Sequence, residues 1–314
     1  MSKLVFVFPG QGSQHVGMGA HLAEQSSKAA EVFERADEIF GMPLSRACFE
    51  GPEEELRQTD ITQPALFATS AATLEVLREA GIEPAAVAGH SLGEYSALYA
   101  AGSFDFETGM RLVATRGHAF AEAGRSQPGS MAAIVGLPAD KVRELCNELG
   151  KETGGTLVAA NQNEPMQTVI SGDPESIEMA CERFREAGAK RALILPVSGA
   201  FHSPLVAPAA DAMHQALKDA EIAEPRVLFV NNADAQPLRD PEAIKGSLVR
   251  QVTSSVRWTA SIQYLLGEGY GTFVEVGSGK ALSGLIRRIN REAVCHTTEN
   301  AAAIEKTVQA LTAK

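Results

Sequence analysis

The sequence lacks the features that would place it among disulfide-rich, metal-binding or membrane proteins. It has no C-x-x-C pair, and its few cysteines are far apart, at Cys48, Cys146, Cys181 and Cys295. That spacing indicates neither a disulfide framework nor a zinc site. No apolar run approaches the length of a membrane span, and the run at 4–8 is too short for the core of a signal peptide. We therefore expect no metal, no membrane association and a cytoplasmic location.

Positive charge is also in deficit. The 314 residues include 28 lysines and arginines against 39 aspartates and glutamates, which gives a formal net charge of −11. Because phosphate binding needs a basic surface, nucleic acid is not expected as the main partner. The chain is 45% hydrophobic, which is ordinary for a globular protein. It is long enough for a substantial core and a second, smaller domain.

The most informative stretch is 85–93, Ala-Ala-Val-Ala-Gly-His-Ser-Leu-Gly. An apolar run ends at Gly89 and a helical pattern begins at Glu94, so Ser91 lies in a turn between a strand and a helix. In this context G-x-S-x-G is the nucleophile-elbow signature, in which a strained turn exposes the serine hydroxyl beside the amides of the following helix. The alternative is a glycine-rich turn in which Ser91 only caps the helix.

Other polar groups lie on loops and helices of the same α/β pattern. The apolar run 3–8 predicts a buried strand, and the loop 9–14 follows it at the edge where open α/β sheets bind ligands. The range 105–123 predicts a helix that contains Arg116, and helical spacing alone favours a surface position for this arginine. His202 lies in a loop just before a further helix.

The pattern changes between 129 and 196, where the elements read strand, helix, strand, strand, helix, strand. This is the ferredoxin-like order. We predict an α/β fold, with a large hydrolase-like domain (1–128 and 197–314) built on a mostly parallel central sheet. A small ferredoxin-like subdomain (129–196) is inserted in it. The final clear strand is predicted at 272–276, and the last helix at about 301–313.

Four motifs stand at characteristic distances from one another: Pro-Gly-Gln-Gly-Ser-Gln at 9–14, Gly-His-Ser-Leu-Gly-Glu at 89–94, Thr-Arg-Gly at 115–117, and Gly-Ala-Phe-His-Ser at 199–203. In this order they resemble the malonyl-CoA:acyl carrier protein transacylase family of fatty acid synthesis. Gln251, with Trp258 beyond it, also matches the family pattern. The resemblance covers essentially the whole chain and is specific as a set, although no single motif is. It implies a free-standing bacterial-type enzyme that moves malonyl from malonyl-CoA to the phosphopantetheine thiol of acyl carrier protein.

The resemblance also implies roles for individual residues. Ser91 would be the nucleophile, and His202 would take its proton and later return it to the leaving thiolate. The backbone amides of Gln11 and Leu92 would form the oxyanion hole. Arg116 would hold the free malonate carboxylate through a two-pronged, charge-assisted pair, so the resemblance reverses the surface position favoured by helical spacing.

The orientation of the histidine is a separate implication. Gln251 would present its main-chain carbonyl to the other ring nitrogen of the histidine, which makes the arrangement a Ser-His dyad and not a full triad. The Gln251 side chain has no role that follows from the sequence. Three acidic residues remain alternatives for a third member, namely Asp173, Asp211 and Asp234.

Substrate choice is expected to depend on residues beside the nucleophile. Related domains that accept malonyl tend to carry a phenylalanine at the position of Phe201, and those that accept methylmalonyl tend to carry a serine, because a large ring leaves little room for an added methyl. Met131 is expected to line the same pocket, with a plain core position as the alternative. Asn161 and Asn163 would contact the pantetheine arm, and His90 would be structural or line the pocket.

Two other functions remain as alternatives. A serine esterase or thioesterase of the α/β-hydrolase type shares G-x-S-x-G, but that fold expects its histidine late in the chain, after an acidic residue. An inactive acyl-carrier-binding module is opposed by the intact Ser91, His202 and Arg116. For the favoured function we expect no cofactor, since CoA and phosphopantetheine enter as parts of the substrates. The expected partners are malonyl-CoA and an acidic acyl carrier protein, and the expected state is a monomer.

Overall fold

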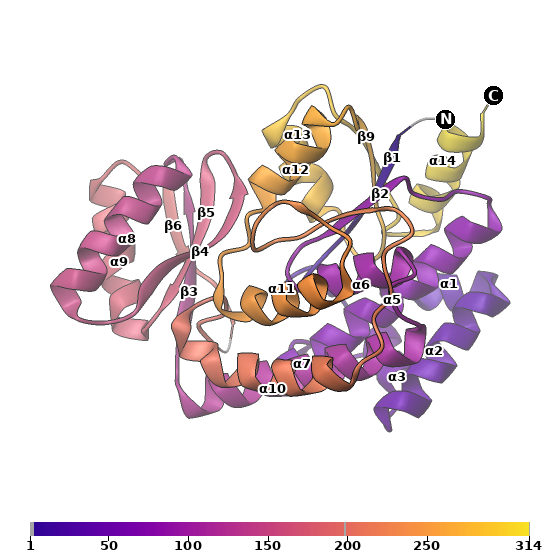
Figure 1. Ribbon diagram of the computed structural model, residues 1–314, viewed down its shortest axis with the longest axis horizontal. Coiled ribbons are helices and arrows are strands. Elements are labelled where there is room, and N and C mark those ends of the chain that lie inside the picture. Colours follow the sequence, from indigo (N-terminus) through magenta and orange to yellow (C-terminus); the bar gives the residue numbers. More distant parts are fainter. Residues whose placement is uncertain (1–2, 198, 314) are drawn as a thin grey trace.

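The computed structural model describes residues 3–197 and 199–313, and it contains two sheets of different kinds (Figure 1). In sheet A the strands lie in the order β10-β9-β1-β2-β7-β8. All neighbours in it are parallel except β7 and β8. The strands of sheet A are β1 (Leu4–Phe8), β2 (Ala86–Gly89), β7 (Leu228–Val230), β8 (Pro237–Leu238), β9 (Thr272–Glu275) and β10 (Val294–Thr297).

The central strand β1 is buried along its whole length. Its alternate side chains point to opposite faces of the sheet. Accordingly, Phe6 and Phe8 belong to the larger apolar cluster, whereas Val5 and Val7 belong to a second cluster with Trp258. Apolar residues on both faces therefore put β1 in the middle of the sheet, with helices covering it on either side.

These helices account for most of the large part of the molecule. Figure 1 shows α7 and α10 running side by side along the bottom of the view. Helices α12 and α13 lie at the top, beside β9. The helices are α1 (Ala20–Gln25), α2 (Ser27–Phe40), α3 (Leu44–Phe49), α4 (Glu53–Leu56), α5 (Thr59–Glu79), α6 (Gly93–Ala100), α7 (Phe106–Ser126), α10 (Ala207–Asp219), α11 (Pro241–Thr253), α12 (Trp258–Gly267), α13 (Ala281–Ile289) and α14 (Ala301–Thr312), with a 3₁₀ turn, η1 (Pro204–Val206).

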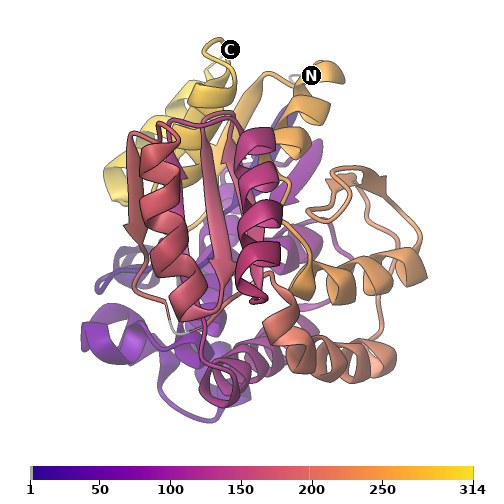
Figure 2. The same ribbon diagram turned by 90° about the vertical axis from the view of Figure 1, so that its left-hand side faces the viewer.

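Sheet B is antiparallel, in the order β4-β5-β3-β6. Two helices cover its outer face, as Figure 2 shows, and form with it a third apolar cluster. On the opposite face Met131, Ala133 and Val169 belong to the large cluster of sheet A, so this face packs against the rest of the protein. Its elements are β3 (Ser130–Val135), α8 (Ala139–Thr153), β4 (Leu157–Glu164), β5 (Gln167–Gly172), α9 (Pro174–Glu186) and β6 (Arg191–Ile194).

The predicted fold class, a mostly parallel sheet with a small antiparallel subdomain, is confirmed. The domain limits at 128/129 and 196/197 stay a prediction. The prediction that 272–276 holds the final strand is wrong, because β10 adds a further strand beyond β9. This strand is short and lies at the edge of the sheet, and its first residue, Val294, is exposed. It therefore lacks the continuous apolar run that marks a buried strand.

Within residues 3–197 and 199–313, none of the helices combines the length and the apolar character that a membrane span requires.

Candidate active site

Ser91 lies in a sharp turn between β2 and α6. Its backbone is in the left-handed region, with φ 53°, which a residue with a side chain adopts only at some cost in energy. The turn can pack tightly on β1 because Gly93 has no side chain: a Cβ there would lie 2.1 Å from the carbonyl oxygen of Phe8. Strand, turn and helix are thus arranged as the sequence pattern predicts, and the Ser91 hydroxyl lies within hydrogen-bond distance of a histidine.

That histidine is His202, which also has a left-handed backbone, with φ 59°. Its Nε2 lies 2.8 Å from Ser91 Oγ, and its Nδ1 lies 2.9 Å from the main-chain oxygen of Gln251. Because a carbonyl oxygen can only accept, Nδ1 must carry the hydrogen, which leaves Nε2 free to accept the serine proton. Burial, together with the charge of Arg116, lowers the pKa of His202 to about 3. The ring is therefore neutral near pH 7 and able to act as a base.

No acidic residue of the described chain occupies the place of a third member, since Nδ1 faces a carbonyl. Asp173 accepts a hydrogen bond from the backbone of Thr156 in sheet B, and Asp211 is exposed on α10. Asp234 accepts hydrogen bonds from Asn231 and Arg250. These contacts leave the dyad as the arrangement that the geometry favours.

Arg116 is buried inside the site, not at the surface. It lies on α7 with 1% of its surface exposed, and its guanidinium lies 4.3 Å from the ring centre of Phe120. Its Nη1 donates to Gln63 Oε1 (2.6 Å), and its Nη2 donates to Gln251 Oε1 (2.9 Å) and to Ser91 Oγ (3.0 Å).

None of the ion pairs in the described chain includes Arg116, and its Nε is buried without a partner. Burial lowers its pKa, although neighbouring Tyr95 and Glu94 oppose that shift. A buried guanidinium that lies against the nucleophile and has no ion-pair partner is suited to receive an anion. The expectation from helical spacing was wrong, because Arg116 lies on the buried face of α7, whereas Arg111 and Arg125 are exposed on that helix.

The two backbone amides predicted to form the oxyanion hole belong to Leu92 and Gln11. Leu92 lies at the N-terminus of α6, and Gln11 lies in the loop after β1. Gly10 brings that loop against the elbow, since a Cβ there would lie 2.5 Å from the carbonyl oxygen of His90. In the hydrogen bonds of the described chain, neither the Gln11 nor the Leu92 amide N–H is used. Both are thus available as donors, and their role as an oxyanion hole stays a prediction.

The residues predicted to set substrate choice lie around this centre. Phe201 is almost fully buried, with its ring centre 5.2 Å from that of Phe120, and Met131 belongs to the same apolar cluster. Asn161 is buried on β4 and forms a bridge with Val256. These positions are compatible with a pocket wall, and their roles in binding stay predictions.

His90 connects the elbow with the small subdomain. Its Nε2 lies 2.8 Å from Asn163 Oδ1 on β4, and its ring packs against Trp258. Burial lowers its pKa. These contacts make it a structural link between the two sheets.

A cavity of about 630 Å³ adjoins one predicted site residue, Gln11, between the start of α5 and the segment 196–197. A larger cavity, of about 860 Å³, lies between α5, α10 and α11 and contains none of the predicted site residues. The larger of these two cavities is therefore not the one that adjoins a predicted site residue.

Several residues of the site were not found from the sequence. The side chain of Gln63 accepts a hydrogen bond from Arg116, and that of Asn232 accepts one from the backbone N–H of Ser91. The side chain of Gln251 contacts Arg116, Ser91 and Glu94. The one signal available was a charged residue, Glu94, at the start of an otherwise apolar helix.

Comparisons with known proteins point in one direction. Residues 5–303 match the model of the acyl transferase domain family. The chain is 43% identical to the malonyl CoA-acyl carrier protein transacylase of Bacillus subtilis (strain 168), over 99% of this chain and 98% of that protein. It is also 43% identical to the transacylase of the same description from Escherichia coli (strain K12), over 92% and 93% of the two chains.

Solved structures agree with these sequence relatives. The malonyl CoA-acyl carrier protein transacylase of Coxiella burnetii matches with a TM-score of 0.95 and 37% identity, over 99% of this chain and 98% of that chain. A malonyl-transacylase solved in complex with its type II PKS acyl-carrier protein matches with a TM-score of 0.94 and 39% identity, over 98% of this chain and all of that chain.

Proposed function

The chain belongs to the acyl transferase domain family, and from this premise we propose that it transfers malonyl from malonyl-CoA to the phosphopantetheine thiol of acyl carrier protein. Relatives that match it almost end to end carry this activity in their names, and one was solved with its carrier protein. The observation that carries the proposal is the pairing of Ser91 with His202, beside a buried arginine that has no ion-pair partner. The product would supply malonyl units for fatty acid synthesis.

The first half of the reaction makes an acyl-enzyme. Ser91 Oγ attacks the thioester carbonyl carbon while its proton passes to Nε2 of His202. The negative charge that develops on the carbonyl oxygen is stabilised by the amides of Gln11 and Leu92. The carbon–sulfur bond then breaks, the proton passes from the histidine to the departing CoA thiolate, and malonyl remains as an ester on the serine.

The second half runs the same steps with the other thiol. The carrier's phosphopantetheine thiol gives its proton to His202 and attacks the malonyl ester, and Ser91 leaves with the proton returned to it. Each half is a thiol–ester exchange, so no oxidant, reductant or resident cofactor is consumed. Arg116 holds the free carboxylate of malonyl in both halves.

We also propose that the protein works as a monomer in the cytoplasm. Its four cysteines are free thiols, which suits a reducing compartment, and every residue of the proposed mechanism comes from one chain. Gel filtration with light scattering would test the monomer.

The mass of the intact protein after incubation with malonyl-CoA tests the function. A stable adduct of one malonyl group that disappears when carrier protein is added is expected for a transferase. Release of free malonate without an adduct would indicate a thioesterase instead. The absence of both would indicate a module that only binds its carrier.

A further prediction concerns how the carrier protein docks. With a net charge of −11, overall attraction cannot guide an acidic carrier, so a local basic patch is expected. The candidate pairs, exposed at the start of β6 and at the end of α13, are Lys190 with Arg191 and Arg287 with Arg288. Replacing both pairs with glutamate should raise the apparent KM for the carrier and spare that for malonyl-CoA.

The matched control reverses Lys141 and Arg143, which are exposed on α8 at the outer face of sheet B. This control should leave both KM values unchanged. If reversal of the candidate pairs leaves the carrier KM unchanged at low salt, the docking surface lies elsewhere.

A further inference from the structure

Glu94 is a completely buried carboxyl group that the mechanism above does not use. It lies in the first turn of α6, three residues after the nucleophile, and none of its surface is exposed. Its Oε1 accepts the backbone N–H of Asn232 at 2.6 Å, and its Oε2 accepts a hydrogen bond from Nε2 of Gln251. Since burying a carboxyl group is costly unless it is hydrogen-bonded, these two contacts are what make its burial tolerable.

Gln251 connects Glu94 with three groups of the site. Its Nε2 donates to the Ser91 main-chain oxygen (2.9 Å) and to Glu94, and its Oε1 accepts from Arg116. Because the Ser91 oxygen can only accept and the Arg116 guanidinium can only donate, the orientation of this amide is fixed. Both amide hydrogens are used, and one of them requires an oxygen of Glu94. The same residue supplies the main-chain oxygen that holds His202.

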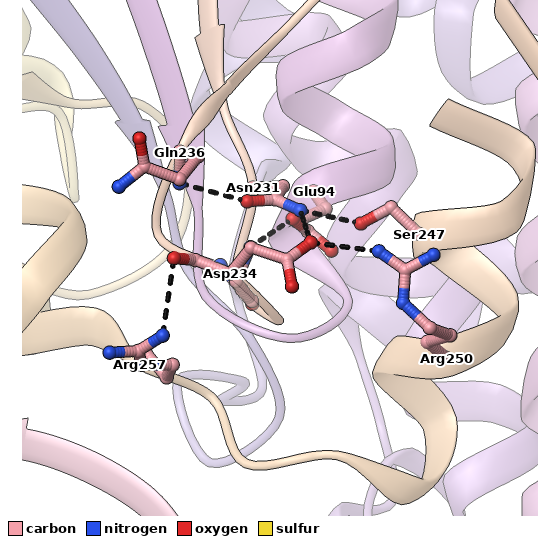
Figure 3. Close-up of polar contacts among 8 residues, drawn as sticks. Glu94, Asn231, Asp234, Gln236, Ser247, Arg250 and Arg257 are labelled. Carbon is pink, nitrogen blue, oxygen red and sulfur yellow. Dashed lines mark hydrogen bonds and ion pairs between the residues drawn. The ribbon is translucent and has the colours of Figure 1, made fainter. Parts of the chain in front are cut away.

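Asn232 connects Glu94 with the nucleophile from the other side. Its Oδ1 accepts the Ser91 N–H at 2.7 Å, and its Nδ2 donates to the Gly89 carbonyl oxygen at 2.7 Å. The loop that carries Asn232 is stabilised by further hydrogen bonds, which Figure 3 shows. Asp234, in the same loop, accepts from Asn231 and from Arg250.

We propose that Glu94 is a positioning residue for acyl transfer, whose carboxylate ties Gln251 to Asn232 and thereby aligns Ser91 with His202. This inference rests on the proposed function. In a dyad the carbonyl of Gln251 fixes the histidine tautomer alone, so the placement of Gln251 matters more than it would in a triad. Burial raises the pKa of Glu94 to about 8, although Asn232, Gln251 and Arg116 oppose that shift. Both of its oxygens accept from N–H groups, so a proton on either oxygen would have no acceptor among these partners, and this geometry is that of the carboxylate. The two donated hydrogen bonds are the contacts that favour its ionised form.

The change that tests this is Glu94→Gln, which keeps the shape and replaces one acceptor oxygen with a donor NH₂. That group must face either the Asn232 N–H or the Gln251 NH₂, so one contact becomes donor against donor. We expect the single-turnover rate of serine loading to fall by about 10²-fold, which is the effect of a small misplacement of reacting groups. Malonyl and acetyl loading should fall together, because both use the same serine and histidine, while the KM for malonyl-CoA changes little.

The matched control is Glu275→Gln. Glu275 is also completely buried, and its carboxylate accepts the backbone N–H groups of Leu282 (3.0 Å) and Ser283 (2.7 Å) at the start of α13, neither of which belongs to the site. This variant should lower the thermal midpoint and keep the loading rate. Loading by Glu94→Gln at the wild-type rate, or a loss no greater than that of Glu275→Gln, would overturn the proposal.

If Glu94→Gln does not fold, Glu94→Asp decides. It keeps two acceptor oxygens on a shorter side chain, so slower loading of both acyl groups with an unchanged circular dichroism spectrum supports the positioning role, and wild-type loading refutes it. The wild-type protein is measured beside each variant. An absent adduct in the wild type would refute the proposed function, whereas a normal wild type with a normal Glu94 variant would refute only the role of Glu94.

Discussion

Ser91→Ala should form no malonyl adduct at all, and His202→Ala should form it more slowly by about 10²- to 10⁴-fold, the usual contribution of a general base. The reason is the 2.8 Å contact between Ser91 Oγ and Nε2 of His202. Without the hydroxyl there is no oxygen to carry the acyl group, and without the ring the serine proton has no acceptor. The measurement is the time course of the intact mass after mixing with malonyl-CoA.

Ser96→Ala is the matched control, because Ser96 is buried on the same helix, α6, one turn further from the nucleophile. It should load malonyl at the wild-type rate. A normal adduct on Ser91→Ala would place the acyl group on another residue and remove the proposed mechanism. Normal loading by His202→Ala would show that the serine finds its base elsewhere.

The parts of the site that the sequence predicts are those carried by local motifs. The elbow around Ser91 needs a strand, a turn and a helix within a few residues, so its pattern is visible in one short stretch. His202 follows a loop whose motif resembles a known family, and Arg116 could be assigned only through that resemblance, because helical periodicity pointed to the surface.

The contacts between distant segments could not be predicted in the same way. Glu94 and Gln251 are 157 residues apart in the chain, and a buried carboxylate or amide has no sequence signal that names its partner. The same limit applies to the fold. The order of elements in sheet B follows from local patterns, whereas the edge strand β10 is short and half-exposed and takes its place only by pairing with β9.

We expect Arg116 to decide which acyl group the site accepts, because malonyl differs from acetyl by one free carboxylate. The guanidinium reaches Ser91 Oγ itself at 3.0 Å, so the free carboxylate of a short acyl group carried on that oxygen lies within its reach. A carboxylate enclosed there without a partner would be costly to desolvate. None of the ion pairs in the described chain involves this arginine, so a malonyl carboxylate would be its direct ion-pair partner.

Arg116→Ala should therefore depress malonyl loading by at least about 10²-fold, since breaking one side of a buried pair costs about 3–5 kcal/mol. Acetyl loading should be spared or improved. Acetyl leaves no carboxylate unpaired, and Gln251 keeps its hydrogen bonds to the Ser91 main-chain oxygen and to Glu94 when the guanidinium is gone. Arg116→Lys should recover only part of the malonyl rate, because an ammonium lacks the rigid fork that matches a carboxylate.

Arg111→Ala is the control on the same helix, where Arg111 is exposed and paired with Glu107 at 2.8 Å, and it should load both acyl groups normally. The measurement is acyl-enzyme formation from malonyl-CoA and acetyl-CoA, side by side, on all four proteins. Equal loss of both substrates in Arg116→Ala would mean that this arginine supports the serine or the fold, and that another group recognises the carboxylate.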